Sequence, residues 1–246
     1  MILYGKPVVD ALREQYAERI EDNARKTRGK RTLMVIKDDT SDKGYLAAIQ
    51  TEAERWKVNL MYAEGLVQAA KMGASRVIDV RKRPKRTMFG FYGVDGQGDY
   101  GRVSAYDGEM NEETSCTAEA IIRMLDYYNI PIAGKHAVVI GRSERVGKPT
   151  AMLLLARDAT VTVCHSKTDR AKLIGQVDSA DIVVCASGQK GLLDWTWVRR
   201  GCTVINVGGD YNTDEYEEYD DGINLIPFKG GVGPVTTAVL MSHVFM

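Results

Sequence analysis

The feature that most constrains the fold is a series of short, continuously apolar segments that alternate with helical patterns over residues 117–207. The predicted strands are His136–Ile140, Thr160–Cys164, Asp181–Ala186 and Cys202–Val207. The predicted helices among them are Ala118–Tyr128, Pro149–Arg157 and Ala171–Val177. Strands that are apolar throughout are buried on both faces, as in a parallel sheet covered by helices. The sequence therefore predicts an α/β fold with a Rossmann-type parallel sheet.

The N-terminal part predicts a second, smaller α/β unit. Apolar residues at helical spacing indicate one helix from Pro7 to about Lys26 and another over Tyr45–Trp56, with a strand at Thr32–Ile36 between them. Residues 57–112 have the least readable pattern, and the glycines in their second half indicate a loop-rich segment. A last helix is predicted over Pro234–Val244, after a glycine turn.

Composition excludes several classes of function. The chain has 246 residues, with 33 basic and 33 acidic side chains, and this zero net charge argues against a dedicated nucleic-acid binder. It has neither an apolar run long enough to span a membrane nor a secretory signal, so we expect a cytoplasmic protein without a membrane partner. The thiols are expected to be buried and free, at Cys116, Cys164, Cys185 and Cys202. The histidines lie too far apart in the sequence to predict a metal site, at positions 136, 165 and 243.

Two charged runs are typical of solvated surface loops. One is basic, Arg81–Arg86, and the other is mainly acidic, Asp214–Asp221. An alternative interpretation of the basic run is that it attracts an anionic substrate tail.

The sharpest local signal is the segment Gly141–Pro149, between a predicted strand and a predicted helix. A doubly wound fold binds phosphate at this place, because a helix start offers free N–H groups and glycines let the backbone approach an anion. The segment is not the usual G-x-G-x-x-G, since Ser143 replaces the second glycine, and Pro149 excludes a Walker A loop. It predicts a nucleotide site, and the alternative is an ordinary strand–helix turn.

The end of the next strand indicates which dinucleotide is bound. NAD sites usually place a carboxylate there for the ribose hydroxyl, and this strand is followed by His165, Ser166 and Lys167 instead. Ser166 can donate to a phosphate, while Arg142 and Lys167 can supply positive charge. This pattern favours NADP over NAD, although Lys167 could simply point to solvent.

Glycines also follow the other predicted strands. Ala186–Gly188 and Val207–Gly209 lie at carboxyl ends of strands, where such sheets bind ligands, although glycines there can simply make turns. Gly230–Thr236 is denser in glycine and opens a helix with proline and threonine, which suits a tight wall around a ligand.

Together these segments resemble the methylenetetrahydrofolate dehydrogenase/cyclohydrolase family. The matching stretches are Tyr4–Pro7, Cys116–Ala118, Gly141–Pro149, Thr160–Thr168, Ala180–Gly188 and Gly230–Thr236. The resemblance implies a folate-side domain at residues 1–115, completed by a C-terminal helix at about 234–246, and an NAD(P)-binding Rossmann domain at 116–233, with a cleft between them. It also implies a homodimer that oxidises 5,10-methylenetetrahydrofolate to 5,10-methenyltetrahydrofolate with NADP. Many members then hydrolyse this product to 10-formyltetrahydrofolate.

The resemblance assigns roles by position. The residues expected to line the dinucleotide are Thr117, Gly141, Arg142, Ser143, Gly147, His165, Ser166, Ser187, Gly188, Gly209 and Thr236. The expected catalytic and folate-binding residues are Tyr45, which would stack on the folate, and Asp95, which would hydrogen-bond the pterin. Further folate contacts are expected at Gln68, Gly231 and Pro234. Asp95 precedes Gly96, so a plain turn is the alternative reading of that residue.

One departure from the family pattern bears on the reaction. The family has a lysine four residues after the tyrosine, and this chain has Ile49. Isoleucine can neither donate a hydrogen bond nor transfer a proton, so we expect cyclohydrolase activity to be absent or very weak. Two other hypotheses stay open, namely an oxidoreductase acting on a different one-carbon carrier or substrate and a catalytically silent nucleotide-binding paralogue.

Overall fold

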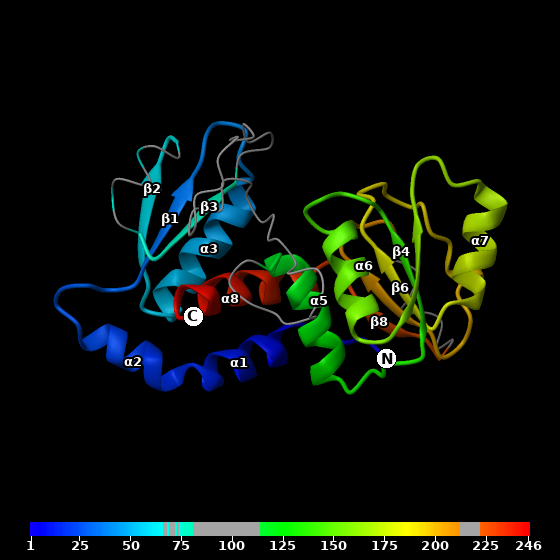
Figure 1. Ribbon diagram of the computed structural model, residues 1–246, viewed down its shortest axis with the longest axis horizontal. Coiled ribbons are helices and arrows are strands. Elements are labelled where there is room, and N and C mark those ends of the chain that lie inside the picture. The colour runs from blue at the N-terminus through cyan, green and yellow to red at the C-terminus, as the bar shows by residue number, and fades with distance from the viewer. Residues whose placement is uncertain (66–67, 69–71, 73, 81–113, 212–221) are drawn as a thin grey trace.

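The computed structural model describes residues 1–65, 68, 72, 74–80, 114–211 and 222–246. These residues form two lobes, each built around a parallel sheet (Figure 1). The smaller lobe has the strand order β2-β1-β3, and the larger lobe has the order β5-β4-β6-β7-β8. The α/β fold with a Rossmann-type parallel sheet, predicted from the sequence, is confirmed.

The smaller lobe is built around a three-stranded sheet, which contacts one helix of the lobe and, at its central strand, the C-terminal helix. Its elements are β1 (Thr32–Ile36), α3 (Lys43–Arg55), β2 (Asn59–Ala63) and β3 (Arg76–Asp79). The predicted strand Thr32–Ile36 is the central one, and its residues from Leu33 onward are fully buried. Residues 57–112 were expected to be loop-rich, and the described part of this range also contains β2 and β3, which were not predicted from the sequence. Both are short edge strands, and β2 is only partly buried, so neither has a continuous buried apolar run.

The first predicted helix is divided into two. It forms α1 (Lys6–Gln15) and α2 (Ala17–Arg25), separated by Tyr16, whose backbone leaves the helical region at φ −104° and ψ 7°. The Tyr16 ring packs against Trp56 at 5.7 Å and against Phe245 at 6.4 Å between ring centroids. The break therefore lies where the N-terminal helices contact both α3 and the C-terminal end of the chain.

The larger lobe alternates strands and helices, as predicted. Its elements are α5 (Cys116–Tyr127), β4 (His136–Ile140), α6 (Gly147–Ala156), β5 (Thr160–Cys164), α7 (Arg170–Ser179), β6 (Ile182–Cys185), the 3₁₀ turn η1 (Trp195–Trp197), β7 (Thr203–Asn206) and β8 (Asn224–Ile226). The 3₁₀ turn η1 and the strand β8 were not predicted from the sequence; each has three residues, and β8 lies at the edge of the sheet.

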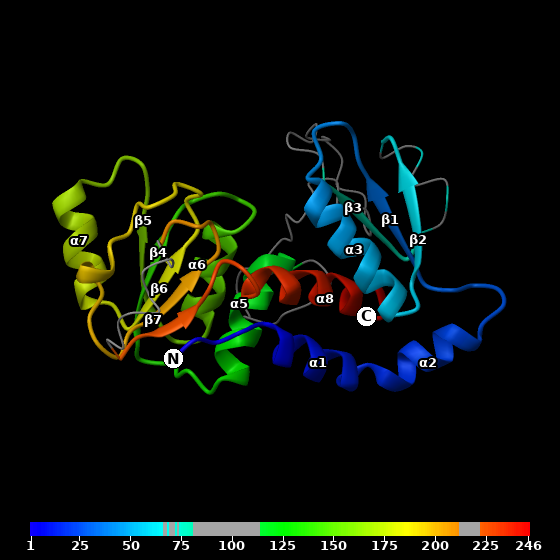
Figure 2. The same cartoon turned by 180° about the vertical axis from the view of Figure 1, so that it is seen from behind.

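Both faces of the five-stranded sheet are covered. Along β4, Ala137 and Val139 enter the core that contains residues of α6, while Val138 and Ile140 enter the core that contains Leu173 of α7. Figures 1 and 2 show α6 and α7 flanking the sheet. Alternate side chains of one strand therefore pack against different helices, which explains why the predicted strands are apolar throughout.

The two ends of the chain cross between the lobes. Helix α8 (Val232–Val244) leaves the larger lobe after β8 and packs against α5, α1 and α3 (Figures 1 and 2). The N-terminus instead lies beside β8, where the Leu3 N–H donates to the Leu225 carbonyl at 2.7 Å. The domain boundaries inferred from the resemblance stay a prediction.

All four cysteines are buried free thiols, as expected. None of the helices in the described ranges is both long and apolar enough to cross a membrane.

Candidate functional site

The loop between β4 and α6 is tightly folded around glycine. Gly141 has a φ of +131°, and a Cβ atom there would lie 2.5 Å from the Ala186 carbonyl oxygen. A Cβ atom on Gly147 would collide with the Gly141 carbonyl group. Glycine is therefore required at both positions, because backbone from two strand ends meets there.

The amides of this loop fall into two groups. The Ser143 hydroxyl accepts the N–H groups of Val146 at 3.2 Å and Gly147 at 3.4 Å, so the start of α6 is satisfied by its own serine. The sequence argument expected these helix-start amides to be free for an anion. In the structure, the amides without a hydrogen bond to any described residue are instead those of Arg142 and Ser143, directly after β4. Two adjacent free amides at this place suit a phosphate group.

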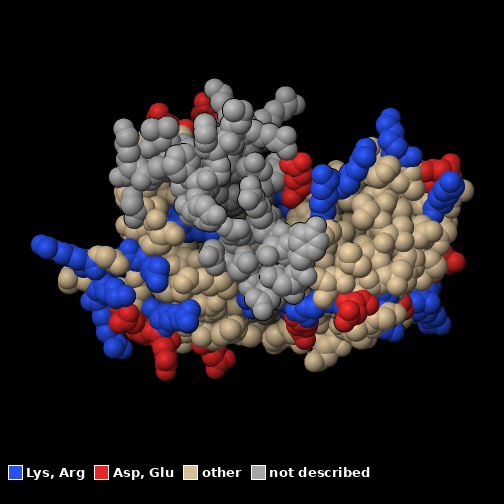
Figure 3. Space-filling view, viewed as in Figure 1, with Lys and Arg blue, Asp and Glu red and all other residues tan. Residues whose placement is uncertain are grey.

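The end of β5 presents polar side chains next to this loop. The Lys167 N–H donates to the His165 ring at 3.1 Å, and the His165 N–H donates to the Thr168 hydroxyl at 2.9 Å. This turn leaves Ser166 and Lys167 exposed, and β5 pairs with β4 immediately before Arg142, which is also exposed. Figure 3 shows Lys and Arg side chains along the upper edge of the larger lobe.

The ends of β6 and β7 are joined by a buried carboxylate. The exposed Ser187 and Gly188 follow β6, and the Ser187 N–H donates to Oδ2 of Asp210 at 2.6 Å. Gly209, with a φ of +75°, follows β7 beside the ring of Phe228. Asp210 was not singled out in the sequence, although an acid directly after two glycines at a strand end was a usable signal.

The first turns of α5 and α8 carry two further predicted dinucleotide contacts. Thr236 is buried, and its hydroxyl donates to the Val232 carbonyl at 3.1 Å within α8. Thr117 is buried in the first turn of α5, a helix that Ser115 caps. These two residues therefore lie on helices that pack together, and the Ser115 hydroxyl donates to the Arg145 carbonyl of the loop after β4 at 2.7 Å.

The folate-side residues begin with α3. Tyr45 is half-buried in the first turn, and its N–H donates to Oδ1 of Asp42 at 2.8 Å, so Asp42 caps the helix. Ile49, one turn later, is fully buried in the main hydrophobic core. Gln68 is exposed and accepts the Glu64 N–H at 3.0 Å.

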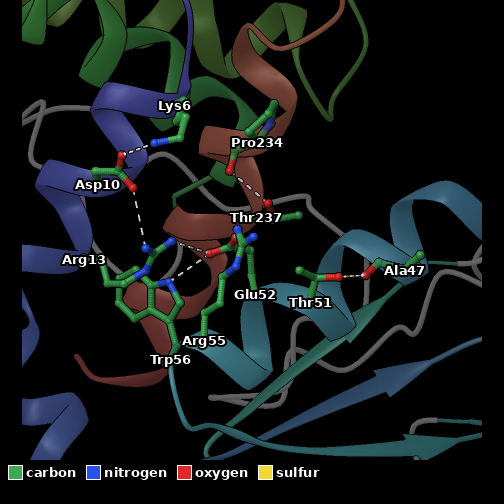
Figure 4. A network of polar contacts seen from close by, with 10 residues as sticks. All are labelled: Lys6, Asp10, Arg13, Ala47, Thr51, Glu52, Arg55, Trp56, Pro234 and Thr237. Carbon is green, nitrogen blue, oxygen red and sulfur yellow. Dashed lines mark hydrogen bonds and ion pairs between the residues drawn. The ribbon is translucent and has the colours of Figure 1, made fainter.

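The remaining predicted residues fall in two groups, those outside the described residues and those at the start of α8. Asp95, the basic run Arg81–Arg86 and the acidic run Asp214–Asp221 lie outside the described residues. At the start of α8, Gly231 is buried against the Pro227 carbonyl group, whereas Pro234 is exposed. The Pro234 carbonyl accepts the Thr237 hydroxyl at 2.9 Å (Figure 4).

A buried carboxylate also anchors α3, the helix that carries Tyr45. Glu52 accepts from Arg55 Nη1 at 2.7 Å, from Trp56 Nε1 at 3.2 Å and from Arg13 Nη2 at 3.4 Å (Figure 4). Arg13 belongs to α1, so these bonds tie α3 to α1. Sequence reasoning missed Glu52, because an acid on a helix gives no local sign of a partner elsewhere in the chain.

The described residues contain no group of three or more His, Cys, Asp or Glu side chains that could hold a metal ion. The polar groups at the strand ends instead provide amide and hydroxyl donors together with basic side chains, which is the chemistry of anion binding.

Comparisons with known proteins agree with this reading of the larger lobe. Residues 115–246 match the NAD(P)-binding domain of the tetrahydrofolate dehydrogenase/cyclohydrolase family. The chain is 44% identical over 133 residues to the bifunctional protein FolD of Shouchella clausii, across 52% of this chain and 47% of that protein. It thus spans about half the length of the curated relatives it matches.

Solved structures cover the whole chain. A 5,10-methylenetetrahydrofolate dehydrogenase from the silkworm Bombyx mori is 26% identical, with a TM-score of 0.80, across 99% of this chain and 96% of that one. The FolD protein of Trypanosoma brucei, solved with NADP and an inhibitor, is 24% identical, with a TM-score of 0.78, across 100% of this chain and 96% of that one. The likeness to the trypanosome structure shows the fold alone.

Proposed function

Because the chain belongs to the tetrahydrofolate dehydrogenase/cyclohydrolase family, we propose that it oxidises 5,10-methylenetetrahydrofolate to 5,10-methenyltetrahydrofolate with NADP as hydride acceptor. The observation that carries this proposal is the anion-binding arrangement at the ends of β4 and β5. It combines two free adjacent amides with exposed basic side chains, and the turn after β5 offers no carboxylate.

The residues present fit NADP in two places. The free amides of Arg142 and Ser143 bind the pyrophosphate, beside the glycine loop. Arg142, Ser166 and Lys167 hold the 2′-phosphate, where an acid would repel it. When bound, NADP supplies a hydride acceptor to the folate carbon.

The remaining dinucleotide contacts follow the strand ends. Gly188 and Gly209 both have positive φ and lie after neighbouring strands, so the backbone can approach a ligand there without a side chain in between. Ser187 lies at the end of β6, whereas Thr117 and Thr236 contribute from the first turns of α5 and α8.

On the folate side, Tyr45 stacks on the substrate and Asp95 hydrogen-bonds the pterin. Gln68, Gly231 and Pro234 provide further contacts. The buried Glu52 network supports the first of these assignments, because it fixes the helix on which Tyr45 lies (Figure 4). Hydride transfer depends mainly on the alignment of the two reacting carbons, which a fixed helix favours.

Cyclohydrolase activity is absent or very weak in this proposal. Hydrolysis of the methenyl product needs a group that manages protons and water, and the family lysine position holds Ile49. Ile49 is fully buried in the main core, so this position offers neither an ionisable group nor contact with solvent.

The proposal includes a cytoplasmic homodimer formed through the larger lobe. β5 is an edge strand of its sheet, and its residue Val163 is 40% exposed. Leu155 of the adjacent α6 is 55% exposed, so this edge offers apolar surface to a second copy. The buried free thiols are consistent with a reducing compartment.

A paired assay tests the function. The purified protein is given methylenetetrahydrofolate with NADP or with NAD, and the reduced cofactor is followed. In parallel it is given methenyltetrahydrofolate, and loss of this compound is compared with the spontaneous rate. We expect reduction of NADP faster than of NAD, without hydrolysis above background. Clear hydrolysis would refute the role of Ile49, and NADP binding without turnover would favour a different substrate or a silent paralogue.

A further inference from the structure

Asp210 is a buried carboxylate with incomplete hydrogen bonding. Asp210 is fully buried, and its Oδ2 accepts the Ser187 N–H at 2.6 Å. Its Oδ1 is also buried and has no hydrogen-bond partner, and no Lys or Arg among the described residues forms an ion pair with Asp210. Buried carboxylates normally have several donors or a cationic partner, whereas among the described residues Asp210 has one donor and no cation.

This carboxylate lies close to the glycine turns that follow β6 and β7. A Cβ atom on Gly208 would lie 3.0 Å from Oδ1 of Asp210 and 2.7 Å from the Gly188 nitrogen. A Cβ atom on Gly141 would lie 3.3 Å from the Ser187 nitrogen, the group that donates to Asp210. Asp210 therefore holds the peptide against which the nucleotide loop packs.

The charge of Asp210 affects its surroundings. The pKa of the Cys185 thiol is raised well above its usual value, first by burial and then by the negative charge of Asp210. Interactions between charges are strong in such a setting, because little water is present to screen them.

The position of Asp210 points to the nicotinamide half of a dinucleotide. In doubly wound folds the two nucleotide halves are bound by the two halves of the sheet. The β4–α6–β5 unit carries the glycine loop and the basic side chains, so the other nucleotide half falls at the ends of β6 and β7. The nicotinamide ring is positively charged when oxidised and neutral when reduced.

We propose that Asp210 makes this site favour the oxidised over the reduced form of the dinucleotide. The Asp210 carboxylate attracts the positively charged nicotinamide ring. The turns between them are made of glycine, so no side chain increases the distance between the two charges. Asp210 thus positions the Ser187 peptide, and its charge determines whether the site prefers the oxidised or the reduced dinucleotide. This inference rests on the proposed function, because it requires a nicotinamide dinucleotide.

The test compares affinities for NADP⁺ and NADPH in the full chain and in Asp210→Asn, measured by calorimetry. The amide oxygen of asparagine can still accept the Ser187 N–H, so the substitution removes mainly the charge. We expect the affinity for NADP⁺ to fall about tenfold, a change of about 1.4 kcal/mol, with the affinity for NADPH changed less than about twofold. The matched control is Asp181→Asn at the opposite end of β6, where the carboxylate accepts the His136 N–H and pairs with Arg199. This control should leave both affinities unchanged.

Each outcome decides between the two proposals. Equal weakening of both forms in Asp210→Asn would assign the residue a purely structural role and overturn this inference, as would no change in either. A second measurement needs no variant, since wild-type protein that binds NADPH more than about tenfold tighter than NADP⁺ would also overturn it. Wild-type protein that binds neither form would instead refute the proposed function.

Discussion

The imidazole Nε2 of His243 lies 2.7 Å from Oε2 of Glu119, and both side chains are fully buried between α8 and α5. The other carboxylate oxygen of Glu119 accepts from Arg123 Nε at 2.7 Å. Helix α8 runs from the larger lobe to the smaller one (Figure 2). The His243–Glu119 pair therefore fixes this connecting helix to α5. The contact joins residues 124 positions apart in the chain.

Removal of this carboxylate should destabilise the whole protein. Glu119→Ala leaves His243 and Arg123 without their acceptor in the interior, and loss of one partner of a buried pair typically costs about 3–5 kcal/mol. Urea unfolding measures the change. Asp126→Ala is the control on the same helix, because it removes only an exposed ion pair with Arg157 and should cost less than about 1 kcal/mol. Similar losses in the two variants would contradict the assignment.

The same pair predicts a loss of stability in acid. Burial raises the pKa of Glu119, but the hydrogen bond and charge of His243, together with Arg123, outweigh it and hold the pKa below the usual 4.5. A lowered pKa in the folded state contributes stability that is present above about pH 4.5 and lost as pH falls through the folded pKa. Wild-type protein should therefore lose more unfolding free energy than Glu119→Gln between pH 5 and pH 3, as measured by urea titration. Parallel pH profiles would argue against a lowered pKa.

The sequence predicted two strands of the larger lobe to the residue, the buried β4 and the partly exposed edge strand β5. The strands His136–Ile140 and Thr160–Cys164 have the predicted bounds, because they are short apolar runs closed by turn residues. The strands β2, β3 and β8 escaped prediction because each is a short edge strand without a long run of β-branched residues. A regular run of β-branched residues, as in β5, predicts even an edge strand, whereas a short edge strand without such a run escapes a local pattern.

The site could be predicted only where its chemistry is local. The loop Gly141–Pro149 stands out because strand, glycines and helix start are contiguous in the sequence. Asp210 is marked only by the two glycines before it and Glu52 by no local feature, since their partners Ser187 and Arg13 lie 23 and 39 residues away. Buried carboxylates are recognised only when the fold has brought their donors to them.

Alanine at Gly141 should disrupt the nucleotide loop. The position combines positive φ with a Cβ location 2.5 Å from the Ala186 carbonyl oxygen, so the two strand ends must separate. We expect a loss of about 2 kcal/mol or more in unfolding free energy and no measurable NADP binding in the assay concentration range. Gly175→Ala, on α7 with open space around it, should instead stabilise by about 0.5–1 kcal/mol. Normal NADP binding by Gly141→Ala would remove this loop from the site.

Arg142 should discriminate between the two dinucleotides. It is exposed directly after β4, and its guanidinium is proposed to pair with the 2′-phosphate, which NAD lacks. In Arg142→Ala we expect the affinity for NADP to fall about 10- to 100-fold with little change for NAD, because charge-assisted bonds contribute about 1.5–3 kcal/mol. Lys135→Ala removes a half-buried cation, 4.0 Å from Asp181, at the opposite end of β4 and should leave both affinities unchanged. Equal losses for NADP and NAD would place Arg142 on the shared pyrophosphate instead.

Restoring the family lysine should damage the fold without restoring hydrolysis. Ile49 is fully buried in the main core, so Ile49→Lys would place an ammonium group among apolar side chains, at a cost of about 3 kcal/mol or more. The control is Gln50→Lys, on the exposed side of the same helix, which should change stability by less than about 0.5 kcal/mol. Thermal unfolding and the methenyltetrahydrofolate assay provide the two readouts. An Ile49→Lys protein with wild-type stability and new cyclohydrolase activity would mean that position 49 reaches the reaction site, and that loss of the lysine alone silenced the second reaction.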